Sequence, residues 1–181
     1  EVFYEAFYED FKMLCESKAT IISLLLQGIH PERFTVSIIE DKVAGTIGIA
    51  DSAGYAISVP KNGLKREFGF IKGSVAAKLL TVEFHRPKTF LPYQGHLEFV
   101  AVREEFRGHG IAKKMLERIF EEGKYKVYTL DVVEGNEKVM PLYESAGFRF
   151  VKKESSKGSK RPGVNFRYLM EKRWRSKNST F

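Results

Sequence analysis

The fold is decided by the stretch LEFVAVREEFRGHGIA, residues 97–112. Its first six residues are apolar and prone to extended structure apart from one glutamate, which predicts a strand over His96–Val102. Its last six residues place two glycines and an alanine where a helix of about His109–Glu122 would begin. Because glycine adopts backbone conformations closed to other residues, this junction can point several N–H groups at one ligand. The free N–H groups and the helix dipole favour an anion there, and the anion that we expect is a pyrophosphate.

The sequence of this junction can be compared with those of two other phosphate-binding loops. A Walker loop requires Gly-Lys followed by Ser or Thr, whereas Gly110 precedes Ile111 and Ala112. A Rossmann fingerprint requires an acidic residue about 20 positions downstream. Asp131 lies near that distance, so spacing alone does not exclude a Rossmann unit. The late position of the loop, after a predicted hairpin, counts against it.

Hydrophobic periodicity predicts helices and then strands before this stretch. A spacing of three or four predicts helix from Val2 to about Gln27, with a second helical run at Ala19–Leu26. The period then becomes two, and the predicted strands are Phe34–Glu40, Val43–Ala50 and, as a third extended run, Tyr55–Val59. The first two strands flank a short polar turn, which predicts a hairpin.

Strands and helices alternate after the stretch, as in α/β proteins. Residues 61–95 are expected to form an irregular excursion from the sheet, with a helix at Lys72–Val82. The later elements are a strand at Lys126–Val133, a short helix ending near Ala146, and strands at Phe148–Lys152 and Val164–Met170. Pro141 fits best in a first helical turn, so the short helix is expected to begin near Val139.

The composition excludes several classes of protein. The chain has 181 residues, of which 43% are hydrophobic, so we expect one domain over residues 1–181 and exclude wholesale disorder. Cys15 is the single cysteine, which rules out an intramolecular disulfide framework and a cysteine zinc site. The histidines lack metal-ligand spacing, so no metal is expected. No apolar run approaches the ~20 residues of a membrane span, so no membrane association is expected and a cytoplasmic location is the default.

The net charge of +7 is concentrated in one segment. Residues 152–181, a predicted basic strand and tail, hold ten Lys and Arg against two acids, a balance of +8, whereas residues 1–151 sum to −1. A basic tail can bind nucleic acid or an anionic ligand, or keep a protein soluble. No nucleic-acid recognition motif accompanies it, so nucleic-acid binding ranks low.

Two motifs carry a resemblance to a known family. The pattern Arg107-x-x-Gly110-x-Ala112 resembles the acetyl-coenzyme A loop of the GNAT family of N-acetyltransferases, which has Gln or Arg, two residues, Gly, one residue, then Gly or Ala. Asn136 and the run Leu142–Phe148 resemble the second family signature, an Asn followed by Leu-Tyr and Gly-Phe. The motifs occur in order, about thirty residues apart, with a predicted strand between them.

The resemblance, close over residues 96–151, implies an α/β fold of the acyl-CoA N-acyltransferase type. Its sheet is mixed, mostly antiparallel and flanked by helices, and its central strands 4 and 5, here residues 96–102 and 126–133, splay apart to admit acetyl-CoA. Asn136 falls in a loop, where a simple cap is an equal interpretation. The implied cofactor-binding residues are Phe99, Val100, Ala101, Val102, Arg107, Gly108, His109, Gly110, Ile111, Ala112, Asn136 and Tyr143.

Acetyl transfer to an amine requires a neutral nucleophile and a proton for the departing thiolate. By family position Tyr143 is the general acid, since a phenol with a pKa of about 10 is protonated at neutral pH. The alternative for Tyr143 is a purely structural role as a buried tyrosine of the hydrophobic core. An alkylammonium has a pKa of about 10.4, so a base or a water chain must take its proton. The resemblance favours Glu98, which shares a strand face with His96; His96, Asp131 and a structural role for Glu98 stay open.

The sequence therefore predicts an N-acetyltransferase that moves an acetyl group from acetyl-CoA directly to a primary amine. Its expected partners are acetyl-CoA and a small-molecule or protein amine, and a homodimer is allowed. A non-catalytic acyl-CoA sensor on the same fold is the first rival, and a nucleic-acid-binding protein that uses the basic tail is the second. The acceptor itself cannot be read from these motifs, because fold and cofactor loop do not define the acceptor pocket.

Overall fold

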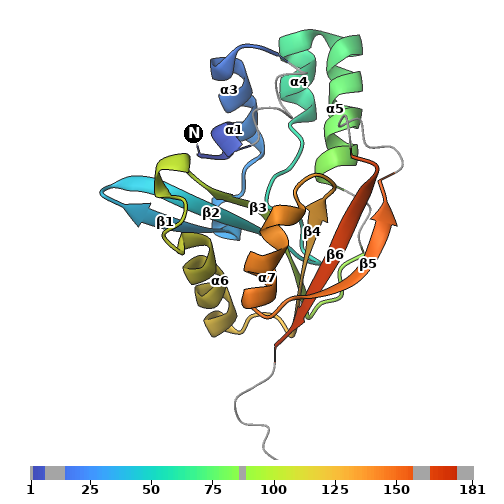
Figure 1. The fold of residues 1–181 in the computed structure, drawn as a ribbon. Helices are drawn as coiled ribbons and strands as arrows, with labels where there is room; N and C mark the ends of the chain where they lie inside the picture. Colours follow the sequence, from blue (N-terminus) through green and yellow to red (C-terminus); the bar gives the residue numbers. More distant parts are fainter. Residues whose placement is uncertain (1, 7–14, 86–88, 157–163, 175–181) are drawn as a thin grey trace, which may run out of the picture.

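A six-stranded sheet organises the computed structural model, which describes residues 2–6, 15–85, 89–156 and 164–174 (Figure 1). In spatial order the strands are β1 (Phe34–Ile39), β2 (Lys42–Ala50), β3 (Gln94–Val102), β4 (Val127–Val133), β6 (Phe166–Arg173) and β5 (Arg149–Ser155). The pairing of β3 with β4 is parallel, and the other four pairings are antiparallel. The predicted mixed, mostly antiparallel sheet is confirmed.

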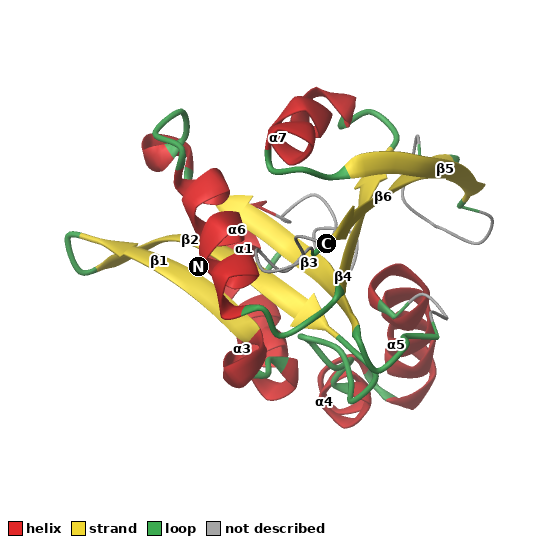
Figure 2. Cartoon of the chain, turned by 90° about the horizontal axis from the view of Figure 1, so that it is seen from below, coloured by secondary structure: helices red, strands yellow, loops and turns green. Residues whose placement is uncertain are grey.

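Helices lie on both sides of this sheet (Figure 1). On one side are α1 (Val2–Ala6), α3 (Lys18–Gly28), α4 (Lys61–Phe68) and α5 (Phe70–Phe84), and on the other are α6 (Ile111–Glu122) and α7 (Met140–Ser145). Seen from below, α6 lies against β1, β2 and β3, and α7 lies nearer β5 and β6 (Figure 2). The main core packs under α6, whose buried residues Ile111, Met115, Leu116 and Ile119 recur at helical spacing. A second core joins α3, α4 and α5.

The first two strands form the predicted hairpin. Its turn residues Glu40 and Asp41 have φ of 49° and 59°. Two successive positive φ values characterise a type I′ turn, whose twist matches that of the flanking strands. The hairpin prediction is therefore confirmed, with β1 ending at Ile39 and not at Glu40.

Two predictions reach residues that the structure does not describe. The helix predicted from Val2 to about Gln27 is present as α1 and α3, while residues 7–14 lie outside the described chain. The basic segment 152–181 supplies the end of β5 and all of β6, while residues 157–163 and 175–181 lie outside it. Both strands begin and end later than predicted. The role of the tail stays a prediction.

The third predicted strand, Tyr55–Val59, is wrong. This segment bonds to the end of α3: the Ser58 N–H donates to the Gly28 carbonyl (2.7 Å), and the His30 N–H donates to the Ala56 carbonyl (3.0 Å). Its backbone groups are thus satisfied without a place in the sheet. The two central strands that were expected as strands 4 and 5 are consequently β3 and β4.

The expectation for residues 61–95 is met in part. The helix predicted at Lys72–Val82 is confirmed within α5, whereas the irregular structure expected before it is wrong, because Lys61–Phe68 forms α4. Gly63 and Gly73 resemble helix breakers in the sequence, yet both are buried inside helices. A Cβ on Gly73 would collide with the Leu64 carbonyl oxygen, so the missing side chain lets the two helices meet at their backbones. This close approach depends on a partner helix that periodicity does not show.

A buried carboxylate ties the end of β2 to the start of β4. Asp51 Oδ1 accepts hydrogen bonds from Arg33 (2.9 Å) and from the Ala53 N–H (2.9 Å), and Oδ2 accepts one from the Tyr125 hydroxyl (2.6 Å). Burial tends to raise the pKa of Asp51, but the bonds from Tyr125, Arg33 and Ala53 outweigh it and lower the pKa to about 2. Burial and the Asp51 charge raise the pKa of Tyr125.

Asp51→Asn is expected to lower the free energy of unfolding at pH 7 by about 2 kcal/mol, because the carboxyl pKa falls from 3.8 to about 2 on folding. A depressed folded-state pKa gives stability that is present above the unfolded pKa and is lost as the pH falls through about 2. Urea denaturation at pH 7 and pH 2 measures this, and the deficit of the variant should shrink at pH 2. Asp41→Asn in the exposed hairpin turn is the control and should cost little. An equal deficit at both pH values would contradict the assignment.

Candidate active site

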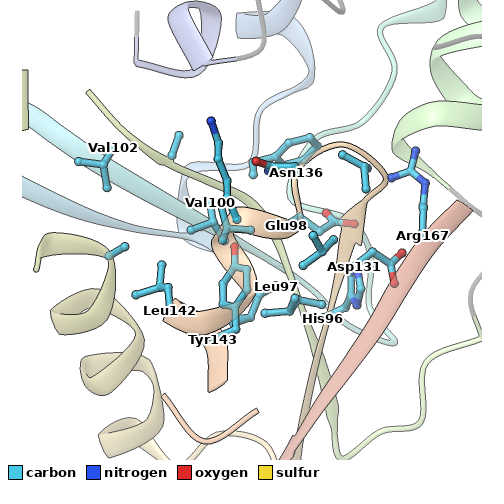
Figure 3. Close-up of a pocket in the computed structure, with 18 of the residues that line it drawn as sticks. His96, Leu97, Glu98, Val100, Val102, Asp131, Asn136, Leu142, Tyr143 and Arg167 are labelled. Carbon is cyan, nitrogen blue, oxygen red and sulfur yellow. The ribbon is translucent and has the colours of Figure 1, made fainter. Parts of the chain in front are cut away.

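A cleft of about 1150 Å³ opens where β3 and β4 part (Figure 3). The ladder between the two strands ends at the pair Leu97 and Leu130, and both strands continue beyond it as walls of the cleft. β3 also carries a bulge, and Phe99 there has a left-handed φ of 52°. Small-molecule pockets usually occupy about 300–1,000 Å³, so this cleft has room for a long ligand together with a second one.

The glycine loop forms one end of the cleft. Gly108 and Gly110 have φ of 80° and 74°, and a Cβ built on either would have no atom within 4 Å. Gly110 precedes the first turn of α6, whose leading N–H groups have no partner within the helix. Arg107 Nε donates to the Val102 carbonyl (3.1 Å) and so ties the loop to β3. An anion at this end would meet N–H donors and the positive end of the α6 dipole.

The predicted cofactor-binding residues all line the cleft except His109. The left-handed glycines on either side of His109 turn the chain there, and the residue lies exposed, outside the cleft wall. Asn136 lines the cleft at the start of the 3-10 turn Glu137–Val139, and its side chain makes no capping hydrogen bond. The structure adds Lys113 and Lys138 to the wall.

Tyr143 reaches the cleft from α7, on the side of the sheet that carries α6. This helix begins at Met140 with Pro141 in its first turn, as the proline predicted. The Tyr143 ring packs edge to face against Phe148 at 6.0 Å between centroids, and 8% of the residue is exposed. Its hydroxyl points toward Val100 of β3 (Figure 3). Burial raises the pKa of Tyr143 to about 12, so the hydroxyl stays protonated at neutral pH.

The three candidate bases lie on the strands that frame the cleft. His96 pairs with Thr129 where the strands are still joined, and its Nδ1 lies 2.9 Å from Thr129 Oγ1. Glu98 and Asp131 are the first residues beyond the last strand pair, on the same sheet face as His96. Glu98 Oε2 also accepts a long hydrogen bond (3.5 Å) from the Ala56 N–H. The divergence of the strands thus places both carboxylates at the opening and His96 deeper in the sheet (Figure 3).

Residues from α5 and β6 complete this face of the cleft. Glu83 and Arg167 form an ion pair of 3.0 Å, and Phe84 packs edge to face against Phe99 at 5.5 Å between centroids. No motif indicated the ion pair in the sequence. Glu83 fell in the segment that was expected to be irregular, and Arg167 was counted only as part of the basic segment.

The described residues contain neither a cluster of metal ligands nor a membrane-spanning helix. They hold no group of three His, Cys, Asp or Glu side chains that could bind a metal ion. Within the same residues, no helix has the length and apolar character needed to cross a membrane.

Solved structures share this architecture. One described as an acetyltransferase is 20% identical, covers 96% of this chain and 93% of its own, and has a TM-score of 0.59. A GNAT family acetyltransferase from Elizabethkingia anophelis with acetyl-CoA bound is 14% identical, with coverages of 87% and 83% and a TM-score of 0.52. The ribosomal-protein-S18-alanine N-acetyltransferase from Escherichia coli is 16% identical, with coverages of 91% and 83% and a TM-score of 0.52. At these identities the likeness shows the fold.

A family comparison covers most of the sequence. No match was found among curated proteins. The model of the acetyltransferase (GNAT) family matches residues 1–148, which include β3, the glycine loop, α6, β4 and α7. The chain therefore belongs to the GNAT family of acetyltransferases.

Proposed function

We propose that the protein is an N-acetyltransferase that moves an acetyl group from acetyl-CoA directly to a primary amine. The observation that carries this proposal is one continuous cleft through the parted strands. The cleft joins the anion-binding glycine loop on the α6 side to the carboxylates on the α5 side. The protonated Tyr143 hydroxyl points into this cleft. A thioester donor and an amine acceptor can therefore approach each other from opposite sides of the sheet.

The glycine loop fits the pyrophosphate of acetyl-CoA. The Gly108 and Gly110 positions leave open space where side chains would stand, and the leading N–H groups of α6 donate to phosphate oxygens. Lys113 adds a positive charge at this wall. The exposed edge of β3 between Val100 and Val102 would hold the amide groups of the pantetheine arm. The structure of a GNAT family acetyltransferase from Elizabethkingia anophelis has acetyl-CoA bound, which supports acetyl-CoA as the donor.

The proposed reaction assigns one proton transfer to each side of the cleft. Glu98 takes the proton of the acceptor ammonium, and the neutral nitrogen attacks the acetyl carbonyl carbon. A C–N bond forms and the C–S bond breaks. The Tyr143 hydroxyl gives its proton to the departing sulfur, and the second proton that the nitrogen loses on becoming an amide restores the Tyr143 hydroxyl through solvent. Glu98 is favoured over His96 because Glu98 lies beyond the last strand pair, whereas His96 is 5% exposed and bonded to Thr129.

Acetyl-CoA at about 100 times its Kd is expected to stabilise the protein by about 2.7 kcal/mol, which raises Tm by roughly 5–10 °C. A thermal melt measures this, with pantetheine, which lacks the pyrophosphate, as the weaker control. A thiol-release assay against a panel of primary amines then tests turnover. No Tm shift would overturn the proposal, and binding without turnover of any amine would favour the acyl-CoA sensor.

A further inference from the structure

A lysine of β6 contacts the end of the helix that carries Tyr143. Lys172 Nζ donates a hydrogen bond to the carbonyl of Ala146, the residue that ends α7. The same Nζ lies 3.7 Å from the centroid of the Phe120 ring of α6, within the range of a cation–π contact. One ammonium group therefore joins the sheet to α6 and α7.

The local sequence makes room for this ammonium group. Gly147 has a φ of 93°, in the left-handed region that favours glycine, and a Cβ on it would stand 3.2 Å from Lys172 Nζ. Partial burial lowers the pKa of Lys172 from its ordinary value, although the charge of Glu117 acts in the opposite direction. A cation that has lost part of its water binds a carbonyl oxygen and an aromatic face more strongly.

The end of α7 depends on contacts of this kind. The helix has six residues and no side-chain hydrogen bond at its N-cap, and a helix so short is unstable without tertiary contacts. The N–H groups of Ala146 and Phe148 both donate to the Tyr143 carbonyl, at 3.1 and 3.0 Å. The Ala146 carbonyl accepts the bond from Lys172 instead. A cation suits this position because the C-terminal end of a helix carries partial negative charge.

The position of the Tyr143 hydroxyl follows from that of α7. No hydrogen bond from a described residue holds this hydroxyl. The Tyr143 ring packs on Phe148, which in turn packs on Phe120 at 5.9 Å between centroids. Ala146 and Tyr143 are three positions apart and so belong to one helical turn. Lys172 thus reaches Tyr143 by two routes, through the Ala146 carbonyl and through the two phenylalanine rings.

We propose that Lys172 is a positioning residue for Tyr143. It fixes the end of α7 against β6 and α6, and so keeps the Tyr143 hydroxyl pointed toward Val100 in the cleft (Figure 3). This inference rests on the proposed acetyl transfer, in which Tyr143 is the acid. Lys172 itself is not among the residues that line the cleft, and it lies outside both sequence motifs.

Lys172→Met removes the ammonium group and keeps an unbranched side chain. It is expected to lower kcat by about tenfold, because small displacements of a reacting group are costly. The KM for acetyl-CoA should change by less than about twofold, since the glycine loop is untouched. Lys172→Arg should restore part of the rate, because a guanidinium can donate to the carbonyl and stack on the ring.

Thiol release from acetyl-CoA, with the best acceptor of the primary-amine panel, measures these rates. Lys126→Met, at an exposed lysine beside the start of β4, is the comparison variant and should keep the full kcat. Circular dichroism checks that each variant folds. An unchanged kcat in Lys172→Met would overturn the inference.

A double-mutant cycle tests whether Lys172 acts through Tyr143. In the Tyr143→Phe background, Lys172→Met should lower kcat by less than about twofold, because the proton donor that it positions is already absent. A general loss of structure would lower kcat by the same factor with and without the Tyr143 hydroxyl. Equal factors in the two backgrounds would therefore overturn the inference.

Amide hydrogen exchange separates this inference from the proposed function. Lys172→Met should speed exchange in residues 142–148 and leave exchange in the β1–β2 hairpin unchanged. Unchanged exchange in residues 142–148 would overturn the inference whatever the turnover, and the acetyl transfer would stand. If the unmodified protein neither binds acetyl-CoA nor acetylates any amine, the proposed function fails, and the role of Lys172 in it fails as well.

Discussion

Tyr143→Phe is expected to lower kcat for acetyl transfer by about 100-fold or more, because a positioned general acid contributes roughly 10²–10⁴-fold. The substitution removes one oxygen and keeps the ring that packs on Phe148. Folding and the KM for acetyl-CoA should therefore change little. Steady-state thiol release at saturating acetyl-CoA measures kcat. Tyr93→Phe, at an exposed tyrosine outside the cleft, is the matched control and should keep the full rate.

The pH dependence tests the same assignment. Because burial raises the pKa of Tyr143 to about 12, its acidic form is present at all pH values below that range. The rate of the unmodified protein should rise with pH as the amine and its base lose protons, and Tyr143 should cause no fall between pH 6 and pH 10. Tyr143→Phe should lower the whole profile without moving its rising limb. Retention of the full rate across this range would identify Tyr143 as a core residue only.

Gly110→Ala is expected to raise the Kd for acetyl-CoA by about tenfold or more. The φ of 74° disfavours any residue with a Cβ by about 1–2 kcal/mol, and relief of that strain would turn the leading N–H groups of α6 away from the phosphates. The new methyl group would also stand in space that is open beside the loop. Isothermal titration calorimetry with acetyl-CoA measures the change in Kd.

Gly123→Ala provides the matched control at the other end of α6. Gly123 has a φ of 61° and lies outside the cleft, where a Cβ would make an ordinary contact with Trp174 at 3.6 Å. Both variants should lose similar stability, because both strain a left-handed residue at an end of the same helix. Only Gly110→Ala should weaken acetyl-CoA binding. Equal Kd values for the two variants would contradict a phosphate site at the glycine loop.

Local sequence patterns predicted the elements whose structure depends on residues only a few positions apart. The turn at Glu40 and Asp41 follows from polar residues between alternating runs, and the start of α7 follows from Pro141. Predictions failed where the reason lay elsewhere in the chain. Tyr55–Val59 has strand-like residues, but its backbone bonds to the end of α3. The helix α4 was not predicted, and its close contact with α5 at Gly73 depends on residues of both helices.

The sequence by itself determined the glycine loop, where we propose that the cofactor binds, because a strand, a glycine turn and a helix start are consecutive and their geometry follows from backbone preferences. The tertiary structure decided the arrangement of the proposed acceptor side. Whether Glu98 or His96 faces the opening depends on where the β3–β4 ladder ends. The Glu83–Arg167 ion pair joins α5 to β6 across 84 positions of sequence. No pattern of neighbouring residues records such contacts, since they form only when the sheet and both cores pack together.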